Sequence, residues 1–121
     1  MNNKIIEKKS TQKDLDDILE QLKYNEQGLI PAIAYDVNSK KVLMLAWMNQ
    51  TSIKLSFETG YATYFSRSRK QLWKKGDTSG HTQKLISIIA DCDFDSLLVN
   101  VEQTGCACHT GKENCFFNEI K

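Results

Sequence analysis

Two apolar stretches joined by a short polar segment constrain the fold of this chain more than any other feature of its sequence. Residues 29–36 and 41–48 are apolar and contain β-branched side chains, which favour strands. The four residues between them, Val-Asn-Ser-Lys at 37–40, include turn formers. This pattern predicts a β-hairpin.

A helix is expected before the hairpin. Its apolar side chains recur at i, i+3, i+4 and i+7, which places them on one stripe of a helix over residues 14–24. They are Leu15, Ile18, Leu19 and Leu22. Thr11 is the expected N-cap, and Gly28 follows where a left-handed residue is wanted.

A second, short helix is expected after the hairpin, from the cap Asn49 through residue 58, with Gly60 ending it. Its Ile53 and Phe57 are spaced to face the core. We expect strands over 61–68, 84–91 and 97–103, a polar loop over 76–81 and an irregular tail over 104–114. Together these segments predict an α+β fold in a single domain, mostly antiparallel β with an N-terminal helix and one short helix.

The composition fits one folded domain with no overall affinity for polyanions. Of 121 residues, 40% are hydrophobic and 26% charged, which excludes a disordered chain. The net charge of +1 gives no general reason to bind nucleic acid or an anionic membrane. The longest apolar run, 42–48, is too short to span a bilayer, and residues 1–10 lack the apolar core of a secretory signal. We therefore expect a cytoplasmic protein without a membrane span.

Three carboxylates alternate along the chain at Asp91, Asp93 and Asp95. On an extended chain they would project from one face, and such hard oxygen ligands suit Mg²⁺ or Ca²⁺. A solvated acidic turn between two strands is an equally good interpretation of these residues alone. A calcium-binding EF-hand loop fails, because Ser96 replaces the required glycine and both flanks are predicted strands.

All four cysteines lie in the last third of the chain, where a cluster in a reducing compartment indicates metal binding or catalysis. Cys92, Cys108 and Cys115 could hold a catalytic zinc ion with one open position. With Cys106 or His109 as a fourth ligand, the zinc would instead be structural. Free buried thiols are the remaining alternative.

A basic segment interleaved with aromatic residues could bind phosphate groups or nucleic acid, or simply protect a strand edge. Its cations are Arg67, Arg69, Lys70, Lys74 and Lys75. Trp73 lies within it, and the only two histidines, His81 and His109, lie in polar loops near the other candidates.

Taken together, these motifs resemble the phosphoribosyl-AMP cyclohydrolases of histidine biosynthesis. The stretches that carry the resemblance are YFSRSR at 64–69, LWKKG at 72–76, TSGH at 78–81, DCDFDSLL at 91–98, ACHTG at 107–111 and CFF at 115–117. The resemblance implies a family domain over 28–121 after an N-terminal extension and helix over 1–27. It also implies a cytoplasmic homodimer, one Zn²⁺ per subunit in a site built by both subunits, and a requirement for Mg²⁺.

Carried over by motif, Asp91, Asp93 and Asp95 are similar to magnesium ligands, and Cys92, Cys108 and Cys115 to zinc ligands. Cys106 stands where relatives usually have another residue. The implied reaction opens the adenine ring of 1-(5-phosphoribosyl)-AMP between N1 and C6, with water activated by zinc. We expect His109 to act as general base or proton shuttle and His81 to assist. The expected substrate contacts are Arg67, Arg69, Trp73, Lys75 and Ser79.

Two other functions compete with this interpretation. A small nucleic-acid-binding module with a structural zinc would use the basic segment and show no turnover. A zinc-dependent nucleobase deaminase would also attack a purine C6, but it needs an H-x-E motif and a P-C-x-x-C motif, and the sequence has neither.

Overall fold

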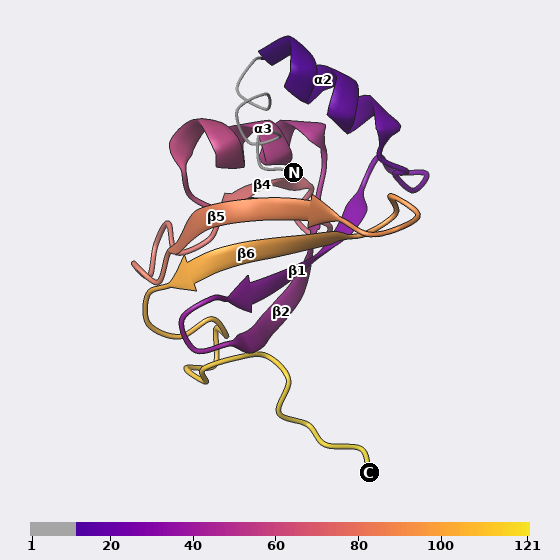
Figure 1. The fold of residues 1–121 in the computed structure, drawn as a ribbon. Coiled ribbons are helices and arrows are strands. Elements are labelled where there is room, and N and C mark those ends of the chain that lie inside the picture. The colour runs from indigo at the N-terminus through magenta and orange to yellow at the C-terminus, as the bar shows by residue number, and fades with distance from the viewer. Residues whose placement is uncertain (1–11) are drawn as a thin grey trace.

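The computed structural model describes residues 12–121, which form two helices and six strands (Figure 1). In chain order these are α2 (Gln12–Gln21), β1 (Ile30–Asp36), β2 (Lys41–Met48), α3 (Gln50–Thr59), β3 (Thr63–Ser66), β4 (Gln71–Lys74), β5 (Gln83–Ala90) and β6 (Leu97–Gln103). Four strands form a sheet in the order β2-β1-β6-β5, and β3 pairs with β4 in a separate hairpin. Only β1 and β6 pair in parallel among these strands, so the predicted mostly antiparallel α+β fold is confirmed.

The predicted hairpin is confirmed as β1 and β2, with Asp36 opposite Lys41 at its turn. Alternate residues of β1 face the core, and of these Ile30, Ala32 and Ala34 have no exposed surface. The Asp36 carboxylate accepts hydrogen bonds from the backbone N–H groups of Asn38 and Ser39, and from that of Gln103 on β6. One carboxylate therefore closes the turn and ties the hairpin to a strand much later in the sequence.

The second helix begins and ends as predicted. Asn49 and Ser52 form a capping box, in which each side chain accepts the other's backbone N–H, and Gly60 ends the helix at φ 82°. The expected burial of Phe57 is wrong, since this side chain is 39% exposed. Ser56 lies at the contact with β3 instead, where its hydroxyl accepts the Thr63 N–H.

The first helix ends at Gln21, before the predicted residue 24. Leu22 still packs in the core beyond its end. Gly28 has the expected left-handed φ of 78°, but it belongs to a separate turn, in which its N–H donates to the Asn25 carbonyl. The predicted cap Thr11 lies outside the described residues.

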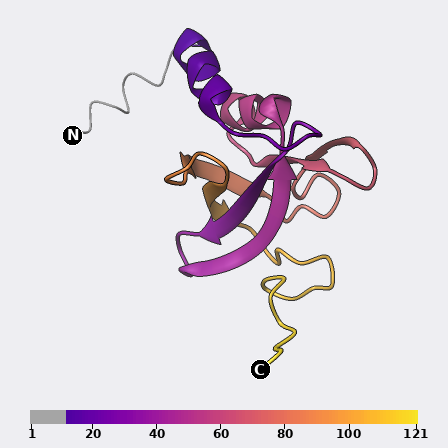
Figure 2. The ribbon, with the colours of Figure 1, turned by 90° about the vertical axis from the view of Figure 1, so that its right-hand side faces the viewer.

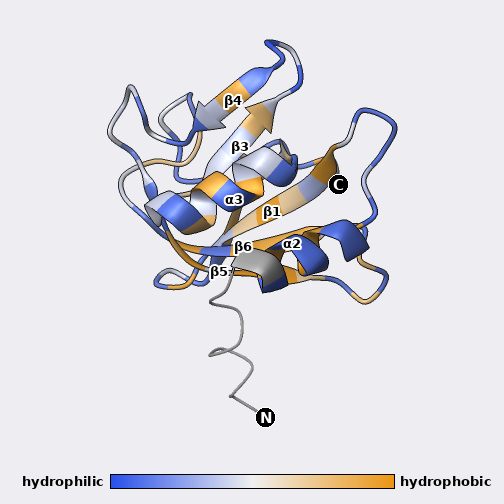
Figure 3. Ribbon diagram, turned by 90° about the horizontal axis from the view of Figure 1, so that it is seen from above, coloured by the Kyte–Doolittle hydropathy of each residue, from blue (hydrophilic) through white to orange (hydrophobic). Residues whose placement is uncertain are grey.

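Both helices lie on one side of the four-stranded sheet (Figures 1 and 2), and α3 also packs against β3. Figure 3, seen from above, shows α2 and α3 in front of β1, β5 and β6, whose orange segments mark apolar residues. The expected strand over 61–68 is shorter, and β4 was not predicted. No helix among residues 12–121 is long and apolar enough to cross a membrane.

The other face of the sheet carries a row of aliphatic side chains without a covering layer among the described elements. Leu45, Ile33, Leu98 and Ile89 are cross-strand neighbours on β2, β1, β6 and β5. Leu45 and Ile89 are 51% exposed and Leu98 is 37% exposed. We call these four residues the outer row. An apolar row of this kind is typical of a face that contacts another molecule.

Candidate active site

A groove of about 490 Å³ brings together two segments that are distant in the sequence: β4 with the loop after it, and the irregular tail after β6. Seven residues of the predicted site line it. They are Arg69, Trp73, Lys75, Ser79, His81, Cys108 and His109. Cys106 also lies in the wall. The loop and the tail, each predicted to lack regular structure, therefore form the two sides of one cavity.

Lys75 joins the two sides of this groove. Its side chain is only 8% exposed, and its ammonium donates a hydrogen bond to the Ala107 carbonyl in the tail. The ammonium also lies 5.3 Å from the centre of the Trp73 ring. Burial lowers the pKa of Lys75, while the nearby thiols of Cys115 and Cys108 act in the opposite direction. Lys75 thus fixes the tail beside the cysteines.

Cys108 and Cys115 are hydrogen-bonded neighbours within the tail, and they differ in acidity. The Thr110 hydroxyl donates to the Cys108 sulfur over 3.1 Å and, with the Thr110 backbone, lowers the pKa of that thiol. Burial raises the pKa of Cys115, and the neighbouring Cys108 raises it further. Cys108 is therefore the thiol of this pair that ionises first, and the pair offers two sulfur ligands to a soft metal ion.

The three aspartates lie together on the β5–β6 connection, with carboxylate oxygens within 4.8 Å of one another. Their predicted extended conformation is wrong, because the segment is a turn in which Phe94 has a φ of 65°. Hydrogen bonds from Ser96 and Asp95 lower the pKa of Asp91, whereas the shared hydrogen bond with Asp91 raises the pKa of Asp95. Carboxylate oxygens this close together could hold a hard divalent cation.

Cys92 lies within this turn, where its thiol donates to the Asp93 carboxylate over 2.8 Å. The turn precedes β6 and adjoins β5, which is one edge strand of the sheet. The tail follows β6 and contacts β2, the other edge strand, where the Cys115 N–H donates a hydrogen bond to the Leu43 carbonyl. The seven residues of β6 alone span roughly 20 Å. Figure 1 shows the two segments at opposite ends of β6.

One chain consequently does not assemble the three predicted zinc ligands. Over residues 12–121, the aspartates are the only group of three or more potential metal ligands whose donor atoms lie this close together. Cys108 and Cys115 occupy one corner of the sheet and Cys92 the corner diagonally opposite.

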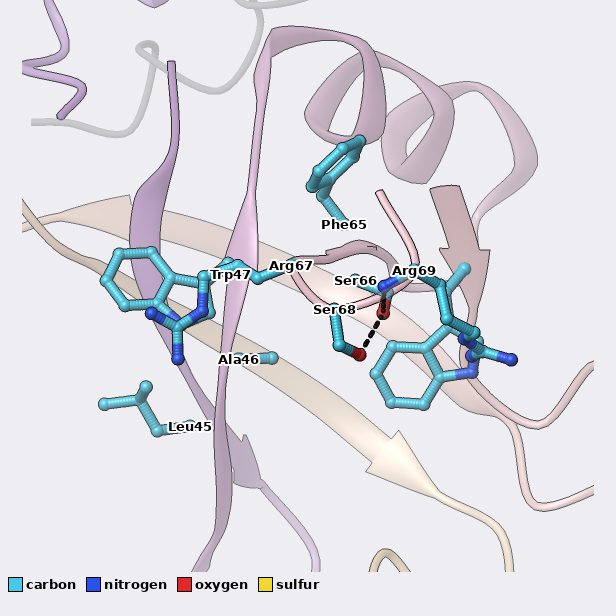
Figure 4. Close-up of a pocket in the computed structure, with 9 residues that line it drawn as sticks. Leu45, Ala46, Trp47, Phe65, Ser66, Arg67, Ser68 and Arg69 are labelled. Atoms are coloured by element: carbon cyan, nitrogen blue, oxygen red, sulfur yellow. Dashed lines mark hydrogen bonds between the residues drawn. The ribbon is translucent and has the colours of Figure 1, made fainter. Parts of the chain in front are cut away.

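The two arginines predicted to act as a pair on a strand are separated, because the chain turns at 67–70 after β3. Figure 4 shows Arg67 against Trp47 on one side of a second hollow and Arg69 on the other. This hollow has a volume of about 310 Å³, and the Arg67 guanidinium lies 4.5 Å from the centre of the Trp47 ring. Arg69 and Trp73 line both hollows. Trp47 was missed, because the sequence pattern identified it only as part of β2.

The two histidines differ in how they are held. His109 is exposed on the tail next to Cys108. His81 is half-buried, and its backbone N–H donates to the Ser79 hydroxyl over 3.1 Å. Both line the larger groove, so the structure brings the two predicted proton-transfer residues into one cavity.

Residues 44–117, more than half of the chain, match the family model described as phosphoribosyl-AMP cyclohydrolase. The chain belongs to the phosphoribosyl-AMP cyclohydrolase family. It is 54% identical over 105 residues to the phosphoribosyl-AMP cyclohydrolase of Haloquadratum walsbyi, covering 87% of this chain and 80% of that protein. The protein of that name from Archaeoglobus fulgidus is 54% identical over 84% of this chain and 94% of its own length. That from Nitrosomonas europaea is 55% identical over 85% and 81%.

Family membership confirms the resemblance derived from the motifs and the prediction of an enzyme, a hydrolase of histidine biosynthesis. The matched region begins in β2 and includes every element that lines the two hollows. It also includes the aspartate turn and all four cysteines.

Proposed function

We propose that this protein hydrolyses 1-(5-phosphoribosyl)-AMP by opening the adenine ring between N1 and C6, the third step of histidine biosynthesis. The observation that carries the proposal is the groove, where motifs from β4, its following loop and the tail meet in a chain that matches the family over residues 44–117. The reaction adds one water molecule across the N1–C6 bond and releases no ammonia. A cytoplasmic location remains a prediction from the sequence.

We propose that the protein binds zinc through cysteine sulfurs and magnesium through aspartate oxygens. Cys108 and Cys115, with Cys92 from a second copy of the chain, would hold Zn²⁺, and the three aspartates would hold Mg²⁺. Bound zinc would supply the Lewis acidity that activates a water molecule for attack on C6. Lys75 supports the site by fixing Ala107, the residue before Cys108.

A homodimer would complete both sulfur sites at once. In an isologous dimer, a contact between residue i of one subunit and residue j of the other occurs twice, because j of the first subunit also meets i of the second. Cys92 of each subunit could thus join Cys108 and Cys115 of the other, which would give two zinc sites per dimer. The outer row supplies the apolar surface that such a contact needs. The separation of Cys92 from the other two thiols and the exposed outer row are the observations that support a zinc site shared between subunits.

The two hollows suit a substrate with two phosphates on opposite sides of a purine. Arg67 with Trp47 lies in one hollow, and Lys75, Ser79 and His81 line the other. Arg69 and Trp73 form their common boundary, where an indole could stack on the purine and a guanidinium could bind phosphate. We therefore assign one phosphorylated arm to each hollow.

The histidines would move the protons of the reaction. His109 is exposed and adjacent in sequence to Cys108, so we assign it the role of general base or proton shuttle for the attacking water. His81 faces the same groove from the opposite wall and would assist at the purine nitrogen. Both assignments put an imidazole, which can accept or donate a proton through its ring nitrogens, beside the reacting bond.

The test is to supply purified protein with phosphoribosyl-AMP, follow the purine absorbance and assay ammonia, with and without a chelator. We expect an absorbance change without ammonia, lost on chelation and restored by Zn²⁺ with Mg²⁺. Ammonia release would instead indicate a deaminase. Salt-dependent oligonucleotide binding without turnover would favour the nucleic-acid module.

A further inference from the structure

The His81 imidazole rests against a glycine that is absent from the predicted site. A β-carbon added to Gly105 would lie 2.5 Å from Cδ2, 2.8 Å from Cγ and 2.9 Å from Nε2 of the His81 ring. These separations are far below van der Waals contact, so no other residue fits there while the ring keeps its place. Gly105 precedes the cysteine-bearing part of the tail, and its φ is 69°.

Hydrogen bonds also fix the backbone of His81. Its N–H donates to the Ser79 hydroxyl, and its carbonyl accepts from the Gln103 amide over 3.2 Å. A β-carbon on Gly76 would collide with the His81 carbonyl carbon, so the chain approaches His81 closely on that side as well. The ring, the N–H and the carbonyl are thus each fixed by a different neighbour.

A buried polar chain anchors the Gln103 contact. The Gln103 side-chain oxygen accepts from the amide of Gln83 over 2.9 Å, and the Gln83 oxygen accepts the Tyr64 phenol over 2.6 Å. Tyr64 and Gln83 have no exposed surface. A buried polar group without a hydrogen-bond partner destabilises the folded state, so these hydrogen bonds hold the three side chains in one arrangement.

We propose that Gly105 is a positioning residue that sets the orientation of the His81 ring in the groove. The catalytic part of this inference rests on the proposed function, because it assumes that His81 acts in the ring-opening reaction. Gly105 is not among the residues that line the groove, so we expect it to act through His81 and not on the substrate. It acts by offering the imidazole a surface without a side chain, while the loop that carries His81 is tied to the buried core.

The first test detects the ring itself by NMR. The chain has only two histidines. The imidazole resonances that disappear in His81→Gln therefore belong to His81, and those that remain belong to His109. We expect Gly105→Ala to shift the His81 ring resonances. Gly28→Ala is the matched control, because Gly28 has a similar φ of 78° and open space around its α-carbon. Unchanged His81 resonances in Gly105→Ala would overturn the proposal.

A second variant separates the effect of contact with the His81 ring from the effect of backbone strain at position 105. Asn tolerates left-handed backbone better than Ala does, so Gly105→Asn adds the β-carbon with less backbone strain. It should shift the same ring resonances. A shift in Gly105→Ala that Gly105→Asn fails to reproduce would mean that backbone strain, rather than contact with the ring, moved His81, and this too would contradict the proposal.

The second test is a double-mutant cycle in turnover. We expect Gly105→Ala to lower kcat by roughly 10- to 100-fold, with a smaller change in KM, and to cause no further loss in a His81→Ala background. Equal losses in both backgrounds would overturn the positioning role. Absence of turnover in wild-type protein supplied with both metals would contradict the proposed function instead, and the NMR result would still decide the contact between Gly105 and His81.

Discussion

The Tyr64 phenol donates a 2.6 Å hydrogen bond to the side-chain oxygen of Gln83, and neither residue is exposed to solvent. Burial raises the pKa of Tyr64 far above its ordinary value, so the phenol remains a donor across the whole working range of pH. This pair ties the β3–β4 hairpin, which borders both hollows, to the first residue of β5.

Tyr64→Phe should destabilise the protein by about 1–3 kcal/mol, because it leaves the buried Gln83 oxygen without a donor while changing little else. The measurement is urea unfolding at neutral pH. Tyr61→Phe is the control, since Tyr61 is an exposed residue near the same hairpin, and its unfolding free energy should stay close to wild type. Equal effects of the two substitutions would contradict the importance of the buried bond.

Asp36 should make stability depend on acid pH. Burial raises its pKa, but the hydrogen bonds from Ser39, Gln103 and Asn38 outweigh this effect and hold the pKa below its ordinary value. Such a carboxyl stabilises the folded state above its unfolded pKa of about 3.9, and this stabilisation is lost as pH falls through the folded value.

Asp36→Asn should therefore lower the unfolding free energy at pH 7 by on the order of 1 kcal/mol, and the difference from wild type should shrink as the pH falls below about 4. Urea titrations at several pH values measure it. Asp17→Asn, at an exposed helical position, should show no such trend. A difference that stays constant with pH would exclude the carboxylate as its source.

Complementation between two variants that are each expected to be inactive tests the proposed zinc site shared between subunits. Cys92→Ser and Cys108→Ser should each abolish turnover, but a mixture refolded together should regain about a quarter of wild-type activity. Half of the dimers would be mixed, and each of these would hold one intact site of two. Ligands that converge within a single subunit would give no recovery.

The outer row can be tested by oligomeric state. Leu98→Lys should yield a folded monomer in analytical ultracentrifugation, with lost zinc and lost turnover, because the charge would be buried in the proposed contact. Lys84→Ala, at an exposed position on the edge strand β5, should leave the sedimentation coefficient unchanged. A wild-type protein that sediments as a monomer would contradict the dimer directly.

Lys75→Met should weaken zinc binding, because it removes the ammonium that fixes the Ala107 carbonyl beside the two thiols. Zinc content after dialysis against a weak chelator is the measurement, and we expect a loss of roughly tenfold or more in affinity. Lys74→Met is the neighbouring control, since the Lys74 ammonium lies over the Tyr61 ring rather than against the tail. Wild-type zinc retention in Lys75→Met would remove this role.

His109→Ala should reduce turnover by about 100-fold while zinc content stays at the wild-type value, because proton transfer by one side chain contributes on this scale. Steady-state kinetics and metal analysis on the same preparation separate the two effects. Undiminished turnover would rule His109 out as the general base. Simultaneous loss of zinc would make it a ligand, as in the structural-zinc alternative.

Local sequence signals predicted the elements that local chemistry determines. The β1–β2 hairpin and the helix cap at Asn49 follow from residues that are neighbours in the chain. The exposure of Phe57 could not be predicted in this way, because Ser56 rather than Phe57 meets Thr63 of β3. Tertiary packing overrode the helical spacing at that position.

In the candidate site too, some features could be predicted from the sequence and others depended on tertiary structure. Motif spacing predicted the groove residues, yet it could not show that Arg67 and Arg69 separate at a turn, since β4 is short and half-exposed. The contact between Gly105 and His81 had no sequence signal beyond a glycine in a tail. The separation of Cys92 from the other thiols depends on β6, whose length and direction only the folded sheet reveals.

The parallel pairing of β1 with β6 joins the first and last strands of the sheet at its centre. The chain from β1 through β6 must leave the ribosome before this pairing is complete, and closing so long a loop slows folding. Nascent chains that stall before β6 would therefore expose the unpaired edge of β1, which is a template for aggregation.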